Sequence, residues 1–195
     1  MDHSIINGIS KYFESLEPRF DLFFATDKGV FLGGAIKPIF QALKQLKDEG
    51  IIRERQTFLD AGSGDGRILA IAVAGKLKAH GIECNEIILE ASRENMKKLI
   101  DLKLIDREPV TVLGDFLENS TYYEALQMPF SSFEVIYTFE TCPLELAEKI
   151  STDSRKNTVF LYHSLKNEPV LVKRLELLKT MDLANHQYLH VYKKA

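Results

Sequence analysis

Closely spaced glycines after an acidic residue form the stretch of this sequence best suited to binding a ligand. Phe58 and Leu59 predict a short buried strand that ends at Asp60, and the glycines predict a tight turn into an apolar helix. Glycine tolerates positive φ and lets a ligand touch bare backbone, and a helix that starts this way offers free N–H groups. We therefore expect a ligand site at this bend. Its residues are Asp60, Ala61, Gly62, Ser63, Gly64, Asp65 and Gly66.

The spacing of the glycines indicates which ligand this bend binds. A dinucleotide site needs G-x-G-x-x-G, but here the third glycine comes one position early and Arg67 takes its place. The observed D-x-G-x-G-x-G resembles the first motif of the class I S-adenosylmethionine-dependent methyltransferases. The resemblance implies that the bend holds the methionine part of S-adenosyl-L-methionine, whose positive charges suit a carboxylate such as Asp60. An ordinary glycine-rich turn between a strand and a helix is the alternative.

Two further acidic residues are expected at the ends of neighbouring strands. Residues 86–90 read as a continuous apolar strand closed by Glu90, and residues 110–113 as a strand followed by Asp115 and Phe116. The resemblance implies that Glu90, with Ala91 beside it, binds the ribose hydroxyls. It also implies that Asp115 accepts a hydrogen bond from the adenine amine and that Phe116 contacts the ring. The alternatives are a solvated strand-end charge, a plain Gly-Asp turn and a core phenylalanine.

The remaining pattern predicts an α/β protein with a Rossmann-like, mostly parallel, doubly wound sheet. Apolar periodicity predicts helices at 4–16, 36–49 and 68–81, one capped by Ser92 and one starting at Pro143. Strands are expected at 133–139 and 158–163, followed by an antiparallel C-terminal hairpin with arms at 170–179 and 186–193. We expect one domain over 1–195, with an N-terminal helical extension (1–50) on a cofactor-binding core (55–195). Residues 20–34 are either a lid over the cofactor or an ordinary covering loop.

The methyl acceptor is expected to meet the ends of the fourth and fifth strands. Tyr137, Phe139 and Glu140 belong to the first of these ends and His163 to the second, and we consider these four the candidate catalytic residues. An aromatic rim with one carboxylate suits an amine, which Glu140 would recruit or from which His163 would accept a proton. The alternatives are a solvated acid at a helix start and a hydrogen-bonded strand-end histidine.

The identity of the acceptor depends on weaker signals. The Asn/Asp-Pro-Pro-aromatic run of base-modifying enzymes is missing at the fourth strand, which argues against a nucleic-acid base. The glycine run at 62–68, the aromatic end of the fourth strand and His163 at the end of the fifth, in a compact chain, together resemble the small single-domain protein-lysine methyltransferases. This resemblance implies a protein lysine as acceptor. A small metabolite is the alternative acceptor, and a cofactor-binding module without catalysis is a third interpretation.

Composition sets the remaining expectations. The net charge of −3 gives no general basic surface for nucleic acid, so the expected partner is a protein or a small-molecule acceptor. Cys84 and Cys142 have no metal-ligand spacing, so we expect no metal site and reduced thiols in a cytoplasmic protein. The longest aliphatic run, 68–74, is too short to cross a membrane.

Overall fold

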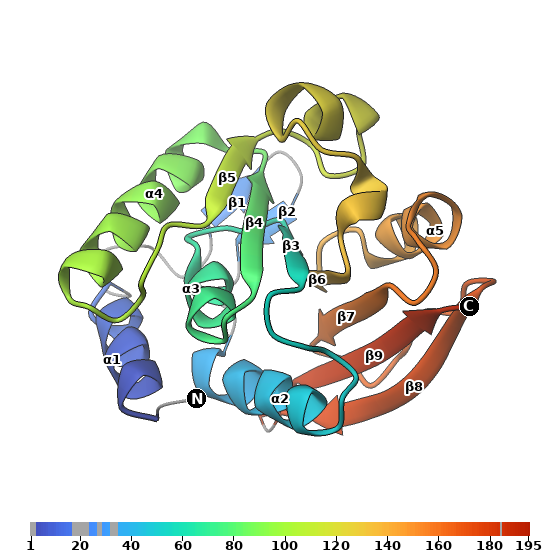
Figure 1. The fold of residues 1–195 in the computed structure, drawn as a ribbon, viewed down its shortest axis with the longest axis horizontal. Helices are drawn as coiled ribbons and strands as arrows, with labels where there is room; N and C mark the ends of the chain where they lie inside the picture. Colours follow the sequence, from blue (N-terminus) through green and yellow to red (C-terminus); the bar gives the residue numbers. More distant parts are fainter. Residues whose placement is uncertain (1–2, 17–23, 27–28, 32–34, 184) are drawn as a thin grey trace.

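A seven-stranded sheet forms the centre of the protein in the computed structural model, which describes residues 3–16, 24–26, 29–31, 35–183 and 185–195 (Figure 1). The strand order is β5-β4-β3-β6-β7-β9-β8, and only β9 runs antiparallel to its neighbours. The strands are β3 (Thr57–Ala61), β4 (Lys78–Glu83), β5 (Val110–Leu113), β6 (Val135–Phe139), β7 (Val159–Ser164), β8 (Leu175–Asp182) and β9 (Tyr188–Lys194). The predicted doubly wound fold with a C-terminal hairpin is confirmed, although β8 begins five residues later than expected.

Helices cover both faces of this sheet because neighbouring residues of each buried strand point to opposite sides. Phe58 packs with the helices of one face and Leu59 with those of the other, so the two positions belong to separate cores. The first face carries α1 (His3–Glu14), α2 (Ile36–Asp48), α3 (Arg67–Ala74) and α4 (Glu86–Asp101). The second carries α5 (Pro143–Asp153), the π-helix η2 (Thr121–Ala125) and the 3-10 turn η3 (Phe130–Ser132).

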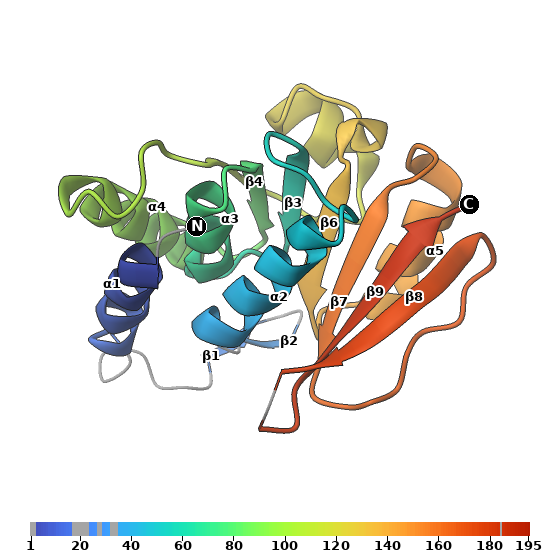
Figure 2. The ribbon, with the colours of Figure 1, turned by 60° about the horizontal axis from the view of Figure 1, so that its bottom comes forward.

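The N-terminal extension is part of the first core. Ile9 and Phe13 of α1 and Phe40 of α2 are buried in it. Between these helices, β1 (Phe24–Thr26) and β2 (Gly29–Phe31) pair as a short antiparallel hairpin, drawn near the start of α2 and the end of β6 in Figure 2. Of the expected lid, 20–23, 27–28 and 32–34 lie outside the described residues. In the described part of the chain, every helix is too short or too polar to span a bilayer.

The region between β3 and β5 differs from our prediction. Residues 86–90 form the first turns of α4, not a strand, because Asn85 caps the helix by accepting from the N–H groups of Ile87 (3.0 Å) and Ile88 (3.1 Å). Ser92, the expected cap, lies inside the helix and is fully buried. The predicted strand at 86–90 and the predicted cap are therefore wrong.

The second strand is instead β4, in the stretch that we assigned to the end of the preceding helix. Gly81, predicted to end that helix, lies in the middle of β4 beneath α3. A Cβ atom at this position would lie 2.7 Å from Leu69 Cδ1, so only glycine lets the helix approach the strand this closely. The helix itself ends at Ala74.

Candidate functional site

The expected site lies where the order of the parallel strands in the sheet reverses, between β3 and β6. β3 pairs with β4 on one side and with β6 on the other, and in open α/β sheets such a switch point is where ligands bind. Asp60 of β3 is 2% exposed, and its Oδ2 has no hydrogen-bond partner within the described residues. Burial raises the pKa of Asp60 well above its usual value, and the nearby carboxylates of Glu83 and Asp65 raise it further. This carboxylate would be stabilised by a bound cation.

The glycine bend begins directly after Asp60 and Ala61 and leads into α3. Gly62 and Ser63 donate their N–H groups to Ile82 O, each at 3.0 Å, so the bend is held against the end of β4. Gly66 has φ = +85°, and a Cβ atom there would collide with Ser92 Oγ of α4. The predicted bend is confirmed as a tight backbone turn. Its glycines have no side chains, so the backbone is bare at the switch point.

The acid at the end of the second strand is Glu83, not Glu90. Glu83 is 6% exposed, and its Oε2 accepts from Gly64 N at 2.9 Å, which joins it to the glycine bend. Glu90 and Ala91 lie within α4, where the exposed Glu90 forms an ion pair with Arg93. The placement of Glu90 and Ala91 at a strand end is therefore wrong. Glu83, the acidic residue two positions before the capping Asn85, was the sequence feature that our prediction overlooked.

Asp115 and Phe116 lie directly after β5, as predicted. Gly114 N donates to Glu83 O at 2.9 Å, so the ends of β4 and β5 are adjacent. Asp115 is half-buried and accepts from Leu117 N, whereas Phe116 is buried in the second core. Asp60, Glu83 and Asp115 therefore lie on three neighbouring strand ends at one edge of the sheet.

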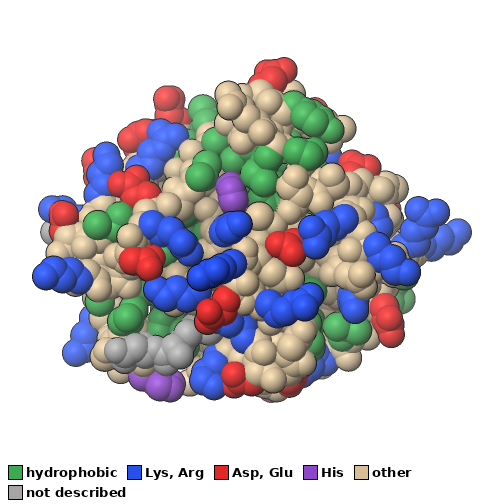
Figure 3. Space-filling view, viewed as in Figure 1, with side chains coloured by type: hydrophobic (Ala, Val, Ile, Leu, Met, Phe, Trp, Pro, Cys, Tyr) green, Lys and Arg blue, Asp and Glu red, His purple; other side chains and the backbone are tan. Residues whose placement is uncertain are grey.

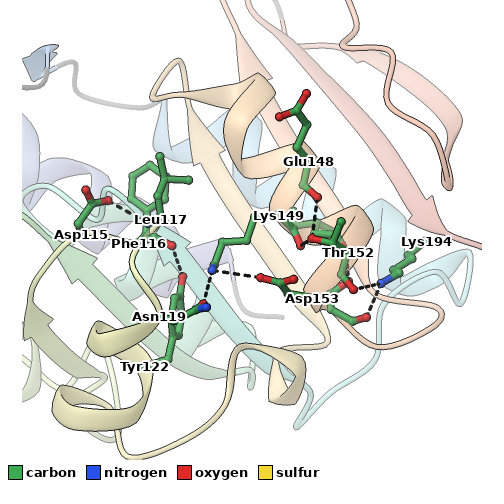
Figure 4. A network of polar contacts seen from close by, with 12 residues as sticks. Asp115, Phe116, Leu117, Asn119, Tyr122, Glu148, Lys149, Thr152, Asp153 and Lys194 are labelled. Carbon is green, nitrogen blue, oxygen red and sulfur yellow. Dashed lines mark hydrogen bonds and ion pairs between the residues drawn. The ribbon is translucent and has the colours of Figure 1, made fainter.

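The π-helix η2 supports the segment that carries Asp115 and Phe116. Tyr122 is buried and donates from Oη to Phe116 O at 2.6 Å (Figure 4). Thr121 Oγ1 donates to Asp115 O at 2.8 Å. The Lys149 ammonium lies 5.4 Å from the Tyr122 ring centroid and donates to Asn119 Oδ1. Short π-helical segments often occur at functional sites, and this one fixes a backbone turn beside the candidate site.

Replacement of Tyr122 by phenylalanine is expected to lower the free energy of unfolding by about 1–2 kcal/mol, because Phe116 O would lose its donor in a buried position. Urea denaturation measures the change. The matched control is Tyr123→Phe, since Tyr123 is 65% exposed on the same helix. Equal stability of the two variants would contradict a supporting role for the Tyr122 hydroxyl.

The end of β6 turns through two left-handed residues. Glu140 has φ = 54° and Cys142 has φ = 43°, conformations that non-glycine residues rarely adopt and that cluster at functional sites. Glu140 Oε1 accepts from Ser164 Oγ at 2.8 Å and from Leu165 N, which ties the end of β6 to the end of β7. Thr141, between the two residues, faces the glycine bend at Gly62. Glu140 and the half-buried Phe139 therefore lie at the end of β6, next to the residue that faces the glycine bend.

Tyr137 and His163 do not lie on the rim, and that part of the prediction is wrong. Both are buried on the Asp60 side of the sheet, and the Tyr137 hydroxyl lies 2.7 Å from His163 Nδ1. His163 Nε2 lies 3.0 Å from Gln187 Oε1, and the imidazole stacks on the Phe139 ring at 4.0 Å. Burial lowers the pKa of His163 to about 4, so the ring is neutral near pH 7. With both nitrogens engaged, His163 positions Phe139 instead of meeting a substrate.

Comparisons with known proteins agree with this architecture. No protein-family model matches the sequence, and no curated protein sequence is similar to it. An RNA methyltransferase from Salinibacter ruber, in complex with S-adenosyl-L-homocysteine, is 20% identical with a TM-score of 0.59, over 83% of this chain and 94% of that one. Magnesium protoporphyrin IX methyltransferase from Synechocystis, with bound S-adenosylmethionine, is 8% identical with a TM-score of 0.60, over 100% of this chain and 98% of that one. This chain has the class I methyltransferase fold.

The class I methyltransferase fold is shared by proteins with different substrates. A geranyl diphosphate C-methyltransferase from Streptomyces coelicolor is also similar in structure, with 12% identity and a TM-score of 0.55 over 80% of this chain and 76% of that one. RNA, a porphyrin and a prenyl diphosphate are thus among the molecules named for these neighbours. The fold alone does not identify a substrate, so any function of this chain has to be inferred from its own side chains.

Charge is distributed unequally between the two edges of the sheet in this class I methyltransferase fold. The four segments after β3, β4, β5 and β6 (60–66, 83–86, 114–118 and 140–145) contain eight Asp or Glu residues and no Lys or Arg in their sequence. In Figure 3, Lys and Arg side chains gather across the face that Figure 1 turns to the viewer, where the segments that enter β3 and β4 lie. The candidate site therefore opens on an acidic edge.

Part of this asymmetry follows from helix dipoles. Glu86 and Glu145 lie in the first turns of α4 and α5, where negative charge is favourable, and the opposite edge carries helix C-termini. The other six acids precede the helices and include the buried Asp60 and Glu83. In the described residues, three or more potential ligands do not gather into a metal site.

Proposed function

We propose that this protein is an S-adenosyl-L-methionine-dependent methyltransferase that acts on an acceptor nitrogen. The observation that carries this proposal is the buried Asp60 carboxylate, whose Oδ2 is without a hydrogen-bond partner within the described residues and lies beside a bare glycine turn. A sulfonium cofactor with an α-ammonium group would give this carboxylate a positively charged partner. A dinucleotide pyrophosphate is negatively charged and would be repelled by it. Structural neighbours with bound cofactor or its demethylated product support the same assignment.

The residues at the three strand ends fit the parts of this cofactor. We propose that Asp60 and the glycine bend hold the methionine part, that Glu83 accepts from the ribose hydroxyls and that Asp115 accepts from the adenine amine. The bound cofactor supplies a methyl group on a good leaving group, which an acceptor lone pair displaces in line. The protein has to hold the acceptor close to that methyl group and exclude water, so no metal or protein nucleophile is required.

We further propose that the acceptor is an amine, with the lysine side chain of a protein as the preferred substrate. The acidic edge attracts an ammonium group and repels a phosphate backbone. Glu140 and Phe139 border this edge, so a carboxylate and an aromatic ring are both available to a cationic side chain. A lysine ammonium must lose its proton before transfer, and the apolar surface at Phe139 favours the neutral form.

A small-molecule amine is the second candidate. The β1–β2 hairpin is the feature that favours it, because a hairpin that covers the carboxyl edge would enclose a small acceptor. To separate the candidates, the protein is incubated with methyl-labelled cofactor and a cell extract, and the label is followed into protein, nucleic acid and small molecules. Label in protein supports the first candidate and label in small molecules the second. Label in nucleic acid would contradict both, and no transfer despite cofactor binding would leave a cofactor-binding module.

The Glu140→Gln variant tests the role of the rim carboxylate in transfer. The two shorter hydrogen bonds to the Glu140 side chain end on Oε1, which the amide keeps, whereas the longer one from Tyr162 Oη (3.5 Å) ends on Oε2. This variant therefore removes the charge and keeps the two contacts that tie the turn to the end of β7. We expect kcat/KM for an amine acceptor to fall about tenfold, which corresponds to the loss of one charge-assisted contact, while cofactor affinity changes little. Glu145→Gln is the control, since Glu145 is exposed on α5. Equal activity of the two variants would make Glu140 a structural residue only.

A further inference from the structure

The N-terminal helix α1 approaches the glycine bend from outside the sheet. Figures 1 and 2 show α1 beside α3 and α4, and α1 and α3 are in direct contact. The approach is close, since a Cβ atom at Gly8 of α1 would lie 2.5 Å from Leu104 Cδ2, just beyond α4. Helix α1 thus belongs to the layer that holds the bend in place.

One hydrogen-bonded route leads from α1 to the backbone of the bend. Tyr12 Oη donates to Asn95 Oδ1 of α4 at 3.0 Å, and Asn95 Nδ2 donates to Asp65 O at 3.0 Å. Asn95 is 6% exposed, so water does not readily replace either contact. The carbonyl group of Asp65 lies between Gly64 and Gly66, two residues that have no side chains to restrict the backbone.

A second route leads from α1 to the side chain of the same residue. The Arg67 guanidinium lies over the Phe13 ring, with Cζ 5.3 Å from the ring centroid. Arg67 also holds the Asp65 carboxylate through Nε and Nη2, the latter at 2.8 Å. Both routes from α1 therefore end on Asp65, one at its carbonyl group and one at its carboxylate.

We infer that α1 is a brace for the glycine bend and that Tyr12 is a positioning residue for cofactor binding, acting through Asn95. This inference rests on the proposed function, because it concerns the bend proposed to hold the cofactor. Glycine turns have many accessible conformations, and a cofactor that binds a single one is bound more weakly when the others become populated. By holding the bend in one conformation in the free protein, α1 reduces this loss of cofactor affinity.

The test compares two variants that each remove one hydroxyl group from α1. Tyr12→Phe breaks the route to Asn95, whereas Ser10→Ala, the control, removes a hydroxyl that donates only to Glu14 within the helix. Hydrogen exchange of the 62–67 amides is measured without ligand, and the Kd of S-adenosyl-L-homocysteine by calorimetry. We expect Tyr12→Phe to exchange faster at the bend and to bind about threefold to tenfold more weakly, the range for one lost hydrogen bond. Ser10→Ala should change neither quantity.

A double-variant experiment separates this role from a general loss of stability. If Tyr12 acts through Asn95, adding Tyr12→Phe to Asn95→Ala should leave the Kd of Asn95→Ala unchanged. Additive losses in Kd, or a Tyr12→Phe variant with altered melting temperature but exchange and Kd equal to those of Ser10→Ala, would overturn the inference. If the unmodified protein does not bind S-adenosyl-L-homocysteine, the proposed function fails, and exchange at the bend still decides whether α1 braces it.

Discussion

The Asp60→Asn variant is expected to bind S-adenosyl-L-methionine about 30-fold more weakly while becoming more stable. The loss corresponds to about 2 kcal/mol, the usual contribution of a hydrogen bond to a charged group. The gain in stability follows because the variant no longer buries a carboxylate with an unpartnered oxygen among two other acids. Calorimetry measures the first effect and urea denaturation the second.

The effect of Asp60 on the free energy of unfolding should depend on pH, and its direction follows from the raised pKa. The folded protein holds the proton of Asp60 to a higher pH than the unfolded chain, because burial, Glu83 and Asp65 raise its pKa from 3.8. The stabilising contribution of this proton is complete below the unfolded pKa and is lost as the pH rises through the folded pKa. Asp60→Asn should not show this loss. His163, whose folded pKa is lowered, contributes with the opposite sign in both proteins, so the difference between their pH profiles isolates Asp60.

Protons should also compete with the cofactor at Asp60. Cofactor affinity of the unmodified protein is expected to rise as the pH increases through the folded pKa of Asp60, because the charged form binds the cation. The variant should lack this rise. A variant with unchanged affinity and an unchanged pH profile would show that Asp60 does not contact the ligand, and the proposed site would then be wrong.

Glu83→Gln is expected to weaken cofactor binding at least about tenfold, because one acceptor for the ribose hydroxyls is replaced by an NH2 group. The same change disturbs the bend, since the two oxygens of Glu83 accept from Gly64 N and Asn85 N, both at 2.9 Å. Glu90→Gln is the matched control on the exposed side of α4 and should bind like the unmodified protein. Calorimetric titration with S-adenosyl-L-homocysteine measures both variants.

If Glu90→Gln weakened cofactor binding and Glu83→Gln did not, the ribose contact would be assigned to Glu90, which would contradict the placement of Glu83 at the site. The melting temperatures of the two variants serve as a second control. A fall for Glu83→Gln is expected because of the lost contacts to the bend, and added ligand should widen that difference, because the variant that binds more weakly is stabilised less.

The glycine bend was predictable because its signal is local. Two apolar residues, an acid, three closely spaced glycines and an apolar helix follow one another directly in the sequence. This pattern predicts a strand, a tight turn and a helix without any information on distant contacts. The parallel strands β6 and β7 were recognised for a similar reason, since strands buried on both faces have apolar sequences. The edge strand β5 is only partly buried, but its short apolar run was also recognised.

β4 was missed because its sequence does not resemble a strand. Lys78 and His80 lie at its exposed start, and Gly81 lacks a side chain because Leu69 occupies that space, so packing against α3 outweighs strand propensity. The apolar residues that follow belong to α4, where Ile87 is 71% exposed. A capping asparagine at 85 marks the boundary and was the local clue to it.

The burial of Tyr137 and His163 could not be read from the sequence. Both residues sit near strand ends, where polar side chains usually face solvent, and only the tertiary contact with Gln187 of the β8–β9 hairpin satisfies the imidazole inside the protein. Such a partner, 24 residues away, gives no periodic signal. The structure therefore brings Asp60, the glycine bend and Asp115 to neighbouring strand ends, whereas Glu90, Tyr137 and His163 lie elsewhere than expected.

The left-handed residues at the end of β6 have a consequence for how the acceptor specificity of this protein can evolve. Side-chain-bearing residues in this conformation cost about 1–2 kcal/mol each, a cost that glycine at 140 or 142 would remove. A loop that is strained in this way is held by its surroundings in one shape, here by the contacts of Glu140 with β7. Insertions in this loop would relieve the strain, and the loop would then no longer keep its present conformation. New acceptors are therefore expected to arise by exchange of side chains on an unchanged backbone.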